Sequence, residues 1–279
     1  MSAINWQRRP HLRRPQAVCA FAGWGDAGDA STGAAHHLIA TLEGDAFARI
    51  DPDDFYEFQA RRPHVEFESG VRSVYWPENE FHALHHPEGD LVVVVGEEPH
   101  LRWRAFTNEI AAALIDLGVT RVVLLGAFLG QVAHSRPVPL VGAASDVSLL
   151  VDHDVGVSDY EGPTGIVGVL TQAFAERGVE AVSVWAAVPH YLSNQTYPPG
   201  IHALVRKTIQ ILGLPLDLSE LAAAAAEYRF SVDAVVADNE ELVGYIEKLE
   251  NAETRNVRQH PDSPVDGLVE EIERFLEER

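Results

Sequence analysis

Short apolar runs, several of them rich in valine, recur along this chain and limit the folds open to it. They occupy residues 16–22, 90–96, 120–126 and 180–188. The run 90–96 is apolar on both faces, which is typical of a central strand in a parallel sheet. Segments with helical patterning separate the runs, at 29–43, 101–117, 164–177 and 198–212. This alternation predicts an α/β protein whose parallel sheet is covered by helices on both faces.

The rest of the chain is less regular. Shorter strands are predicted at 46–50 and 138–142, and short strands with loops over 54–88. After Pro215 the sequence becomes rich in Ala and Glu, and two helical segments, 218–250 and 266–277, flank a polar gap. We therefore expect an α/β core domain, 1–215, and a C-terminal helical appendage, 216–279, that packs on the core or on a neighbouring subunit.

The charge balance limits the partners. The chain holds 21 basic and 42 acidic residues, a net charge of −21. Such a surface repels phosphate groups, so we expect no nucleic acid and no membrane as partners, whereas basic partners stay open. No apolar run approaches the ~20 residues of a membrane span. A single cysteine, Cys19, permits no disulfide framework. Four early arginines, at 8, 9, 13 and 14, are interpreted as a surface arm of a cytoplasmic protein.

Polar loops follow four of the predicted strands at their carboxyl ends. Ligand sites of parallel sheets form outside these ends. We therefore expect the four loops to meet at one rim, and this rim is the predicted site. Its candidate pocket residues are Asp26, Glu98, His134, Arg136 and His190.

The first of these loops contains a Gly-x-Gly-x-x-Gly pattern, formed by Gly23, Gly25 and Gly28. After a strand and before a helix, this pattern is typical of dinucleotide sites. A pyrophosphate, however, needs a free and positive helix N-terminus. Asp26 and Asp29 would place negative charge there, so we expect no cofactor.

Other chemistry is weighed residue by residue. Asp26, Glu97 and Glu98 could serve acid–base catalysis or bind Mg²⁺, or they could cap a turn and face solvent. A triad around His134 lacks the Gly-x-Ser-x-Gly elbow of hydrolases. Arg136 could recognise a carboxylate or phosphate, or pair internally with Asp26 or Glu98. We predict no catalytic residues and no metal site.

Several short motifs occur in a characteristic order. They are Phe21–Gly28 (FAGWGDAG), Arg62-Pro63, Trp76-Pro77, Gly96–Pro99 followed by Trp103, His134–Pro137, Tyr160–Pro163 and Val188–Tyr191. Together they span roughly residues 15–250, and the ordered set resembles the bacterial and archaeal branch of the second proteasome assembly chaperone family.

This resemblance implies a three-layer α/β/α sandwich with a mostly parallel central sheet, like that of phosphorylases and some hydrolases. It also implies homo-oligomers, trimers or multiples of them, and in eukaryotic relatives a chaperone that orders proteasome α-subunits. The family supplies no established catalytic residues. The motifs supply candidate pocket or interface residues: Trp24, Asp26, Glu98, Trp103, His134, Arg136, Tyr160, His190 and Tyr191. Proteasome-docking proteins often end in hydrophobic–Tyr–any residue, whereas this chain ends Leu276-Glu277-Glu278-Arg279, which leaves other surfaces for docking.

Two functions follow as hypotheses. The first is a non-catalytic homo-oligomeric binding protein that could assist or regulate proteasome-like complexes, with itself and proteasome subunits as partners. The alternative is an enzyme that acts on a small anionic or nucleoside-like ligand at the carboxyl ends of the strands. An ATP-dependent ligase is disfavoured because the chain lacks a Gly-x-x-x-x-Gly-Lys-Ser/Thr loop.

Overall fold

The computed structural model describes residues 2–68 and 70–251. Their strands are β1 (Ile4–Trp6), β2 (Gln16–Ala22), β3 (Asp45–Ile50), β4 (His64–Glu68), β5 (Val71–Tyr75), β6 (Asn79–Leu84), β7 (Leu91–Glu97), β8 (Arg121–Gly130), β9 (Leu140–Ala144), β10 (Gly156–Val157) and β11 (Glu180–Pro189). Their α-helices are α1 (Ala30–Thr41), α2 (Trp103–Asp116), α3 (Ser148–Val151), α4 (Ile166–Ala175), α5 (Pro198–Leu212), α6 (Ser219–Ala237) and α7 (Glu240–Asn251).

One sheet organises the molecule. Its order is β1-β3-β6-β7-β2-β8-β11-β9-β10. The neighbouring pairs among β7, β2, β8 and β11 are parallel, so the buried runs found in the sequence form the centre. On one flank β6, β3 and β1 join antiparallel, and on the other β9 runs antiparallel to β11. The carboxyl ends of the four central strands therefore meet along one edge of the molecule.

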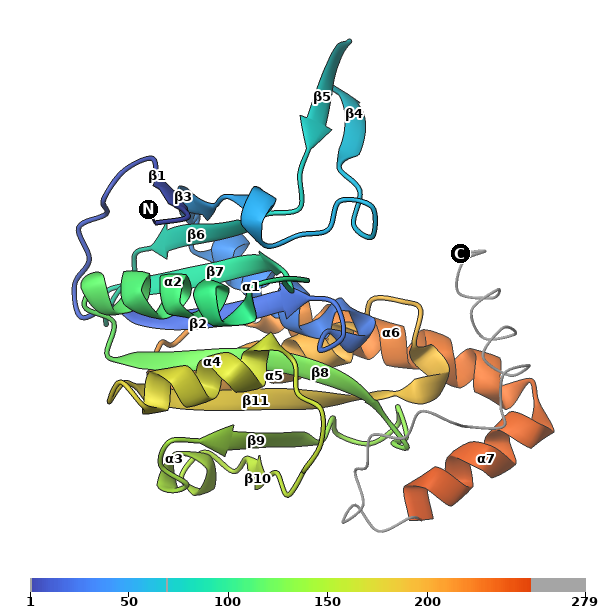
Figure 1. Cartoon of the computed structure of the whole chain (residues 1–279). Helices are drawn as coiled ribbons and strands as arrows, with labels where there is room; N and C mark the ends of the chain where they lie inside the picture. The colour runs from blue at the N-terminus through green and yellow to red at the C-terminus, as the bar shows by residue number, and fades with distance from the viewer. Residues whose placement is uncertain (1, 69, 252–279) are drawn as a thin grey trace.

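Helices cover both faces of this sheet (Figure 1). The α1 and α5 helices pack together on one face, and α2 and α4 on the other. Alternate side chains of the central strands lie on opposite faces of the sheet and belong to two separate cores. In β7, Val93 and Val95 belong to the α1–α5 core, while Val92 and Val94 belong to the α2–α4 core. Both sets are buried, which explains the continuous apolar run.

The predicted α/β class is thus confirmed, as a sandwich with helices on both sides of a sheet that is parallel at its centre. Two features escaped the sequence reading. The short strand β1 adds an edge to the sheet, and β6, within the segment expected to hold short strands and loops, pairs directly with β7. The helix predicted at 266–277 lies outside the described residues.

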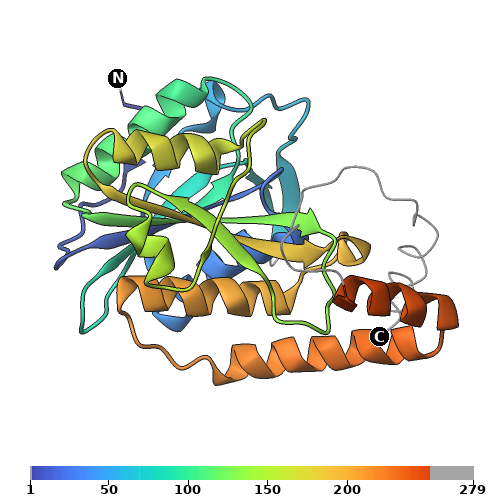
Figure 2. The same cartoon turned by 90° about the horizontal axis from the view of Figure 1, so that it is seen from below.

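The last described helices follow Pro215. Figure 2 shows α6 running beside α5, with α7 folding back along the far end of α6. Val232, Val235 and Ile246 from these helices join the α1–α5 core. Across the described ranges, no helix combines the length and the apolar character needed to cross a bilayer.

The β4–β5 hairpin is separate from the main sheet. It is inserted between β3 and β6 and projects away from the sandwich (Figure 1). At its base, Phe58 and Trp76 make an edge contact with ring centroids 4.8 Å apart.

Candidate functional site

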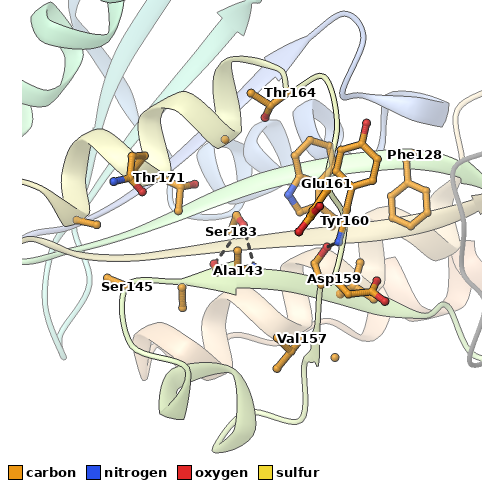
Figure 3. Close-up of a pocket in the computed structure, with 18 of the residues that line it drawn as sticks. Phe128, Ala143, Ser145, Val157, Asp159, Tyr160, Glu161, Thr164, Thr171 and Ser183 are labelled. Carbon is orange, nitrogen blue, oxygen red and sulfur yellow. Dashed lines mark hydrogen bonds between the residues drawn. The ribbon is translucent and has the colours of Figure 1, made fainter.

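A pocket opens beside α4, on the face of the sheet that α2 and α4 cover. It has a volume of about 1000 Å³ and is bordered by α4 and by the segment 156–164 (Figure 3). Ala143 of β9 and Ser183 and Trp185 of β11 line it from the sheet, and Thr171 lines it from α4. Apart from Trp185 these side chains are small, so this part of the sheet surface is accessible to a ligand.

A second pocket, of about 700 Å³, adjoins the first at the carboxyl ends of β2 and β8. Trp24, Phe128 and Tyr160 line both pockets, and we call the two together the strand-end groove. Trp24 is 57% exposed and Tyr160 is 48% exposed. The Tyr160 hydroxyl donates to the carbonyl of Pro163 at 3.0 Å, which holds this ring at the mouth of the groove.

The charges around the strand-end groove all have one sign. Asp26, Asp29, Asp159 and Glu161 line it, and within the described residues no lysine or arginine does. Carboxylates beside exposed aromatic faces favour a cationic or apolar guest, because the ring faces and the carboxylates both attract positive charge. The same charges repel an anion, so this lining does not suit the small anionic ligand considered from the sequence.

Asp26 holds the start of α1. Its carboxylate accepts the backbone N–H groups of Ser31, at 2.7 Å, and of Thr32, at 3.2 Å, and both hydroxyls also donate to it. Burial raises the pKa of Asp26 above 3.8, and these hydrogen bonds act in the opposite direction. The helix N-terminus that a pyrophosphate would need is therefore already occupied by the protein's own carboxylate. Gly28, the last glycine of the pattern, lies against Tyr197, where an added Cβ would come within 2.8 Å of the Tyr197 Cβ.

Replacing Asp26 by alanine should cost about 2 kcal/mol of unfolding free energy, because buried donors at the start of α1 lose their acceptor. Asp26→Asn should cost less, since its amide oxygen still accepts the Ser31 N–H while its amide group can donate to Thr32. Urea unfolding of the three proteins measures this order. Equal stability of the alanine and asparagine variants would contradict the capping role.

Glu98 likewise caps the start of another helix. Its Oε1 accepts the backbone N–H of Ile166, the first residue of α4, at 2.8 Å. Trp103 opens α2, and its indole N–H donates to the carbonyl of Pro99 at 2.7 Å. Both residues thus fix the helices of one layer to the loop that follows β7.

His134 lies in a buried network beneath α6. Its Nδ1 is 2.8 Å from the hydroxyl of Tyr191, which also accepts the His134 backbone N–H. Its Nε2 is 3.0 Å from Oδ1 of Asp233. The pattern assigns the proton to Nε2, which donates to Asp233, while Nδ1 accepts from Tyr191. Burial lowers the pKa of His134, and the bond to Asp233 raises it.

His190 is held in a similar way. Its Nδ1 donates to the carbonyl of Gly130 at 3.2 Å, and its Nε2 accepts from the hydroxyl of Tyr245 on α7 at 3.0 Å. Burial lowers the pKa of His190. Arg136, in contrast, is exposed and forms no ion pair with any described residue, so the internal pair with Asp26 or Glu98 is not formed.

The structure separates the residues of the predicted rim. Trp24, Asp26 and Tyr160 line the strand-end groove, and Glu98 lies beside Trp24, both near Gly165. The other candidates are placed elsewhere: His134, His190 and Tyr191 join the core to α6 and α7, Trp103 starts α2, and Arg136 faces solvent.

Several residues of the site were missed in the sequence. Phe128, Ser183 and Trp185 lie within strands that are otherwise buried, so nothing in the local pattern marked them as groove residues. Asp233 and Tyr245 come from the appendage, which was not connected with the rim. A polar or bulky residue inside an apolar strand was the available signal: the Ser183 hydroxyl donates to the carbonyl of Ala143 at 3.2 Å and accepts its N–H at 3.1 Å.

The geometry defines an α/β/α sandwich with an open acidic groove at its strand ends. The family model of the PAC2 family matches residues 20–236, and the chain belongs to this family. It is 41% identical to a PAC2 family protein from Streptomyces avermitilis, with a TM-score of 0.76, over 83% of this chain and 99% of that one.

Two further solved structures are informative. A proteasome-assembly chaperone homologue from Mycobacterium tuberculosis is 37% identical, with a TM-score of 0.76, over 82% of this chain and 99% of that one. An archaeal proteasome activator from Pyrococcus furiosus is 21% identical, with a TM-score of 0.65, over 83% of this chain and 97% of that one, and shows the shared fold alone. No curated protein matches the sequence.

Proposed function

We propose that the protein is a non-catalytic, homo-oligomeric binding protein of the cytoplasm that assists or regulates proteasome-like complexes. In this proposal residues 1–215 form the α/β core domain and residues 216–279 form an appendage on it. The family and the relative described as a proteasome-assembly chaperone homologue support the direction of the proposal.

The non-catalytic part of the proposal rests on one observation: the candidate acid–base groups form hydrogen bonds within the fold. Asp26 and Glu98 accept backbone N–H groups at helix starts. His134 and His190 each have both ring nitrogens engaged within the protein. A general acid or base must exchange a proton with a bound substrate. These four side chains instead use their polar atoms in hydrogen bonds that stabilise the fold.

The acidity of the chain supports a protein partner with basic surface. A net charge of −21 raises the association rate with such a partner at low salt and slows it as ions screen the charges. The alternative is an enzyme for a small nucleoside-like ligand, and the volume of the strand-end groove supports it. The following experiment distinguishes the two functions.

Affinity capture of the tagged protein from its own host's lysate is the test. We expect proteasome subunits at stoichiometric yield, identified by mass spectrometry, and a yield that falls when salt is raised from 50 to about 500 mM. Excess untagged protein should displace the tagged protein, and a lysate with the tag alone serves as control.

Recovery of the protein without proteasome subunits would overturn the proposal. So would saturable turnover of a small molecule by the wild type that is lost on both Asp26→Asn and His134→Ala under conditions in which urea unfolding shows both variants to be folded.

A further inference from the structure

The β4–β5 hairpin is left uncovered by the described residues of its own chain. Its strands pair antiparallel from His64 opposite Tyr75 to Glu68 opposite Val71. Every described side chain of the two strands is exposed, apart from the half-buried Ser73. Phe67 is 72% exposed, as much as any large apolar side chain among the described residues. A lone two-stranded hairpin is marginal in water, so a partner is needed to hold this one in shape.

One face of the hairpin is suited to such a partner. Val65 lies opposite Val74, and Phe67 lies opposite Arg72. Directly opposed residues share a face, and so do alternate residues of one strand. This hairpin face therefore presents three apolar side chains and, beside Phe67, one guanidinium. Arg72 forms no ion pair with a described residue.

One positive charge lies on this apolar face of the hairpin. Arg72 shares the face of Phe67, whereas Glu66 lies on the other face, because successive residues of a strand alternate. The whole chain, in contrast, has twice as many acidic as basic residues, 42 against 21. An apolar patch with positive charge, on an otherwise acidic molecule, is complementary to the molecule's own acidic surfaces.

The strand-end groove has the matching properties. Two of its aromatic residues, Trp24 and Tyr160, are about half exposed, and Val157 at its border is 57% exposed. Asp159 and Glu161 lie in the same border segment, and Figure 3 shows them beside Tyr160. An apolar side chain and a guanidinium from outside would meet an aromatic face and a carboxylate here.

The hairpin and the larger pocket of the groove lie on different flanks of the sheet. The hairpin is inserted next to β6, on the β1–β3–β6 flank, while the larger pocket lies along β11, β9 and β10 at the other flank. Figure 1 shows the hairpin and the strands β9 and β10 on opposite sides of the sandwich. Two complementary patches on opposite sides of one molecule make a head-to-tail contact between copies, which closes into a ring when the rotation permits.

We propose that the β4–β5 hairpin of one copy docks into the strand-end groove of the next copy, with Phe67 against the aromatic residues and Arg72 against Glu161 or Asp159. This inference rests on the homo-oligomer part of the proposed function and names the surfaces that build it. The groove is complete only when the neighbouring copy contributes its hairpin.

The first test measures self-association by light scattering after gel filtration. The wild type should exceed the chain mass of 30.6 kDa. Phe67→Ser should weaken self-association at least tenfold. Phe230→Ser is the matched control, because Phe230 on α6 is equally exposed, at 72%, and lies outside both surfaces. A monomeric wild type, or equal masses for Phe67→Ser and the wild type, would overturn the inference.

Charge reversal then tests the contact itself. Arg72→Glu and Glu161→Arg should each weaken self-association, and the double variant Arg72→Glu/Glu161→Arg should recover part of it. Recovery is not expected for the mismatched pair Arg72→Glu/Glu176→Arg, because Glu176 lies past the C-terminal end of α4 and does not line the groove. Recovery by that pair would point to net charge and contradict a specific contact.

Cross-linking distinguishes this arrangement from hairpin-to-hairpin pairing and from another partner. The only cysteine, Cys19, is fully buried, so the background is low. Val65→Cys and Val157→Cys chains, co-expressed with different tags, should be joined by a short bis-maleimide, and neither chain should cross-link with itself. Cross-linking of Val65→Cys alone would establish two hairpins in contact and overturn the inference. A ring confirmed here without proteasome capture would reject the proposed function and leave this contact standing.

Discussion

Replacing Gly126 by valine is expected to lower the unfolding free energy by about 3 kcal/mol or more, although valine is a favoured strand residue. Gly126 lies in the centre of β8, opposite Trp185 of β11. A Cβ at this position would lie 2.3 Å from Cε3 of the Trp185 indole and 2.5 Å from Cδ2. The strand backbone on either side is fixed in the sheet, so the conflict can be relieved only by moving a half-buried indole. Overpacking typically costs about 1–3 kcal/mol and occasionally more, and valine adds two further methyl groups at this close contact.

Thermal unfolding at a fixed protein concentration measures this effect. With roughly 2–4 °C per kcal/mol for a chain of this size, the melting temperature should fall by about 6–12 °C. Gly130→Ala is the control on the same strand, because its Cβ would make an ordinary contact at 3.5 Å, and we expect a change within about 1 kcal/mol. A Gly126→Val protein that melts within 2 °C of the wild type would show that the indole moves freely.

Removing the His134 side chain should cost about 3 kcal/mol at pH 7.5. His134→Ala leaves the buried Tyr191 hydroxyl without its acceptor, deprives Asp233 of its donor, and opens a cavity under α6. His11→Ala, on the exposed N-terminal segment, should be neutral and serves as control.

The same side chain makes stability depend on pH. Burial lowers the pKa of His134 from 6.5, against the raising effects of Asp233 and Glu250, while Arg229 acts in the lowering direction. Below pH 6.5 the unfolded chain takes up a proton that the folded protein refuses, so stability falls as the pH drops, by up to about 1.4 kcal/mol per pH unit for this histidine. The raised pKa of Asp26 has the opposite effect on stability: at lower pH the folded protein takes up this proton more readily than the unfolded chain and is stabilised by it.

Urea unfolding of the wild type and His134→Ala from pH 7.5 to 5.5 isolates this contribution, because other groups titrate in both proteins. The advantage of the wild type should shrink as the pH falls. An advantage that stays constant or grows would contradict a neutral His134 in the folded state.

The strands and helices of this protein follow from its local patterns. The run 90–96 is apolar on both faces because β7 lies between two helical layers, and Gly213 ends α5 in the left-handed conformation that glycine adopts without strain. The location of the strand-end loops along one edge was also predictable, because the carboxyl ends of parallel strands lie on the same side of a sheet.

Which of these loops share a site was decided by tertiary structure. His134 and His190 follow central strands as Trp24 and Asp26 do, yet α6 and α7 cover them with Asp233 and Tyr245. Local sequence carries no record of such contacts, because Asp233 lies 99 residues from His134 along the chain. At the first loop, the sequence already indicated that Asp26 would disfavour a phosphate, and the fold added the contacts that its carboxylate makes with Ser31 and Thr32 at the start of α1.

The residue types and their order along the chain thus determined by themselves that this protein is an α/β sandwich with polar strand ends. The strand-end groove, the separate histidine networks and the outward hairpin arose only in three dimensions. The physical reason is that periodicity shows which side of an element is buried, whereas the segments that cover that side are set by contacts between residues far apart in the sequence.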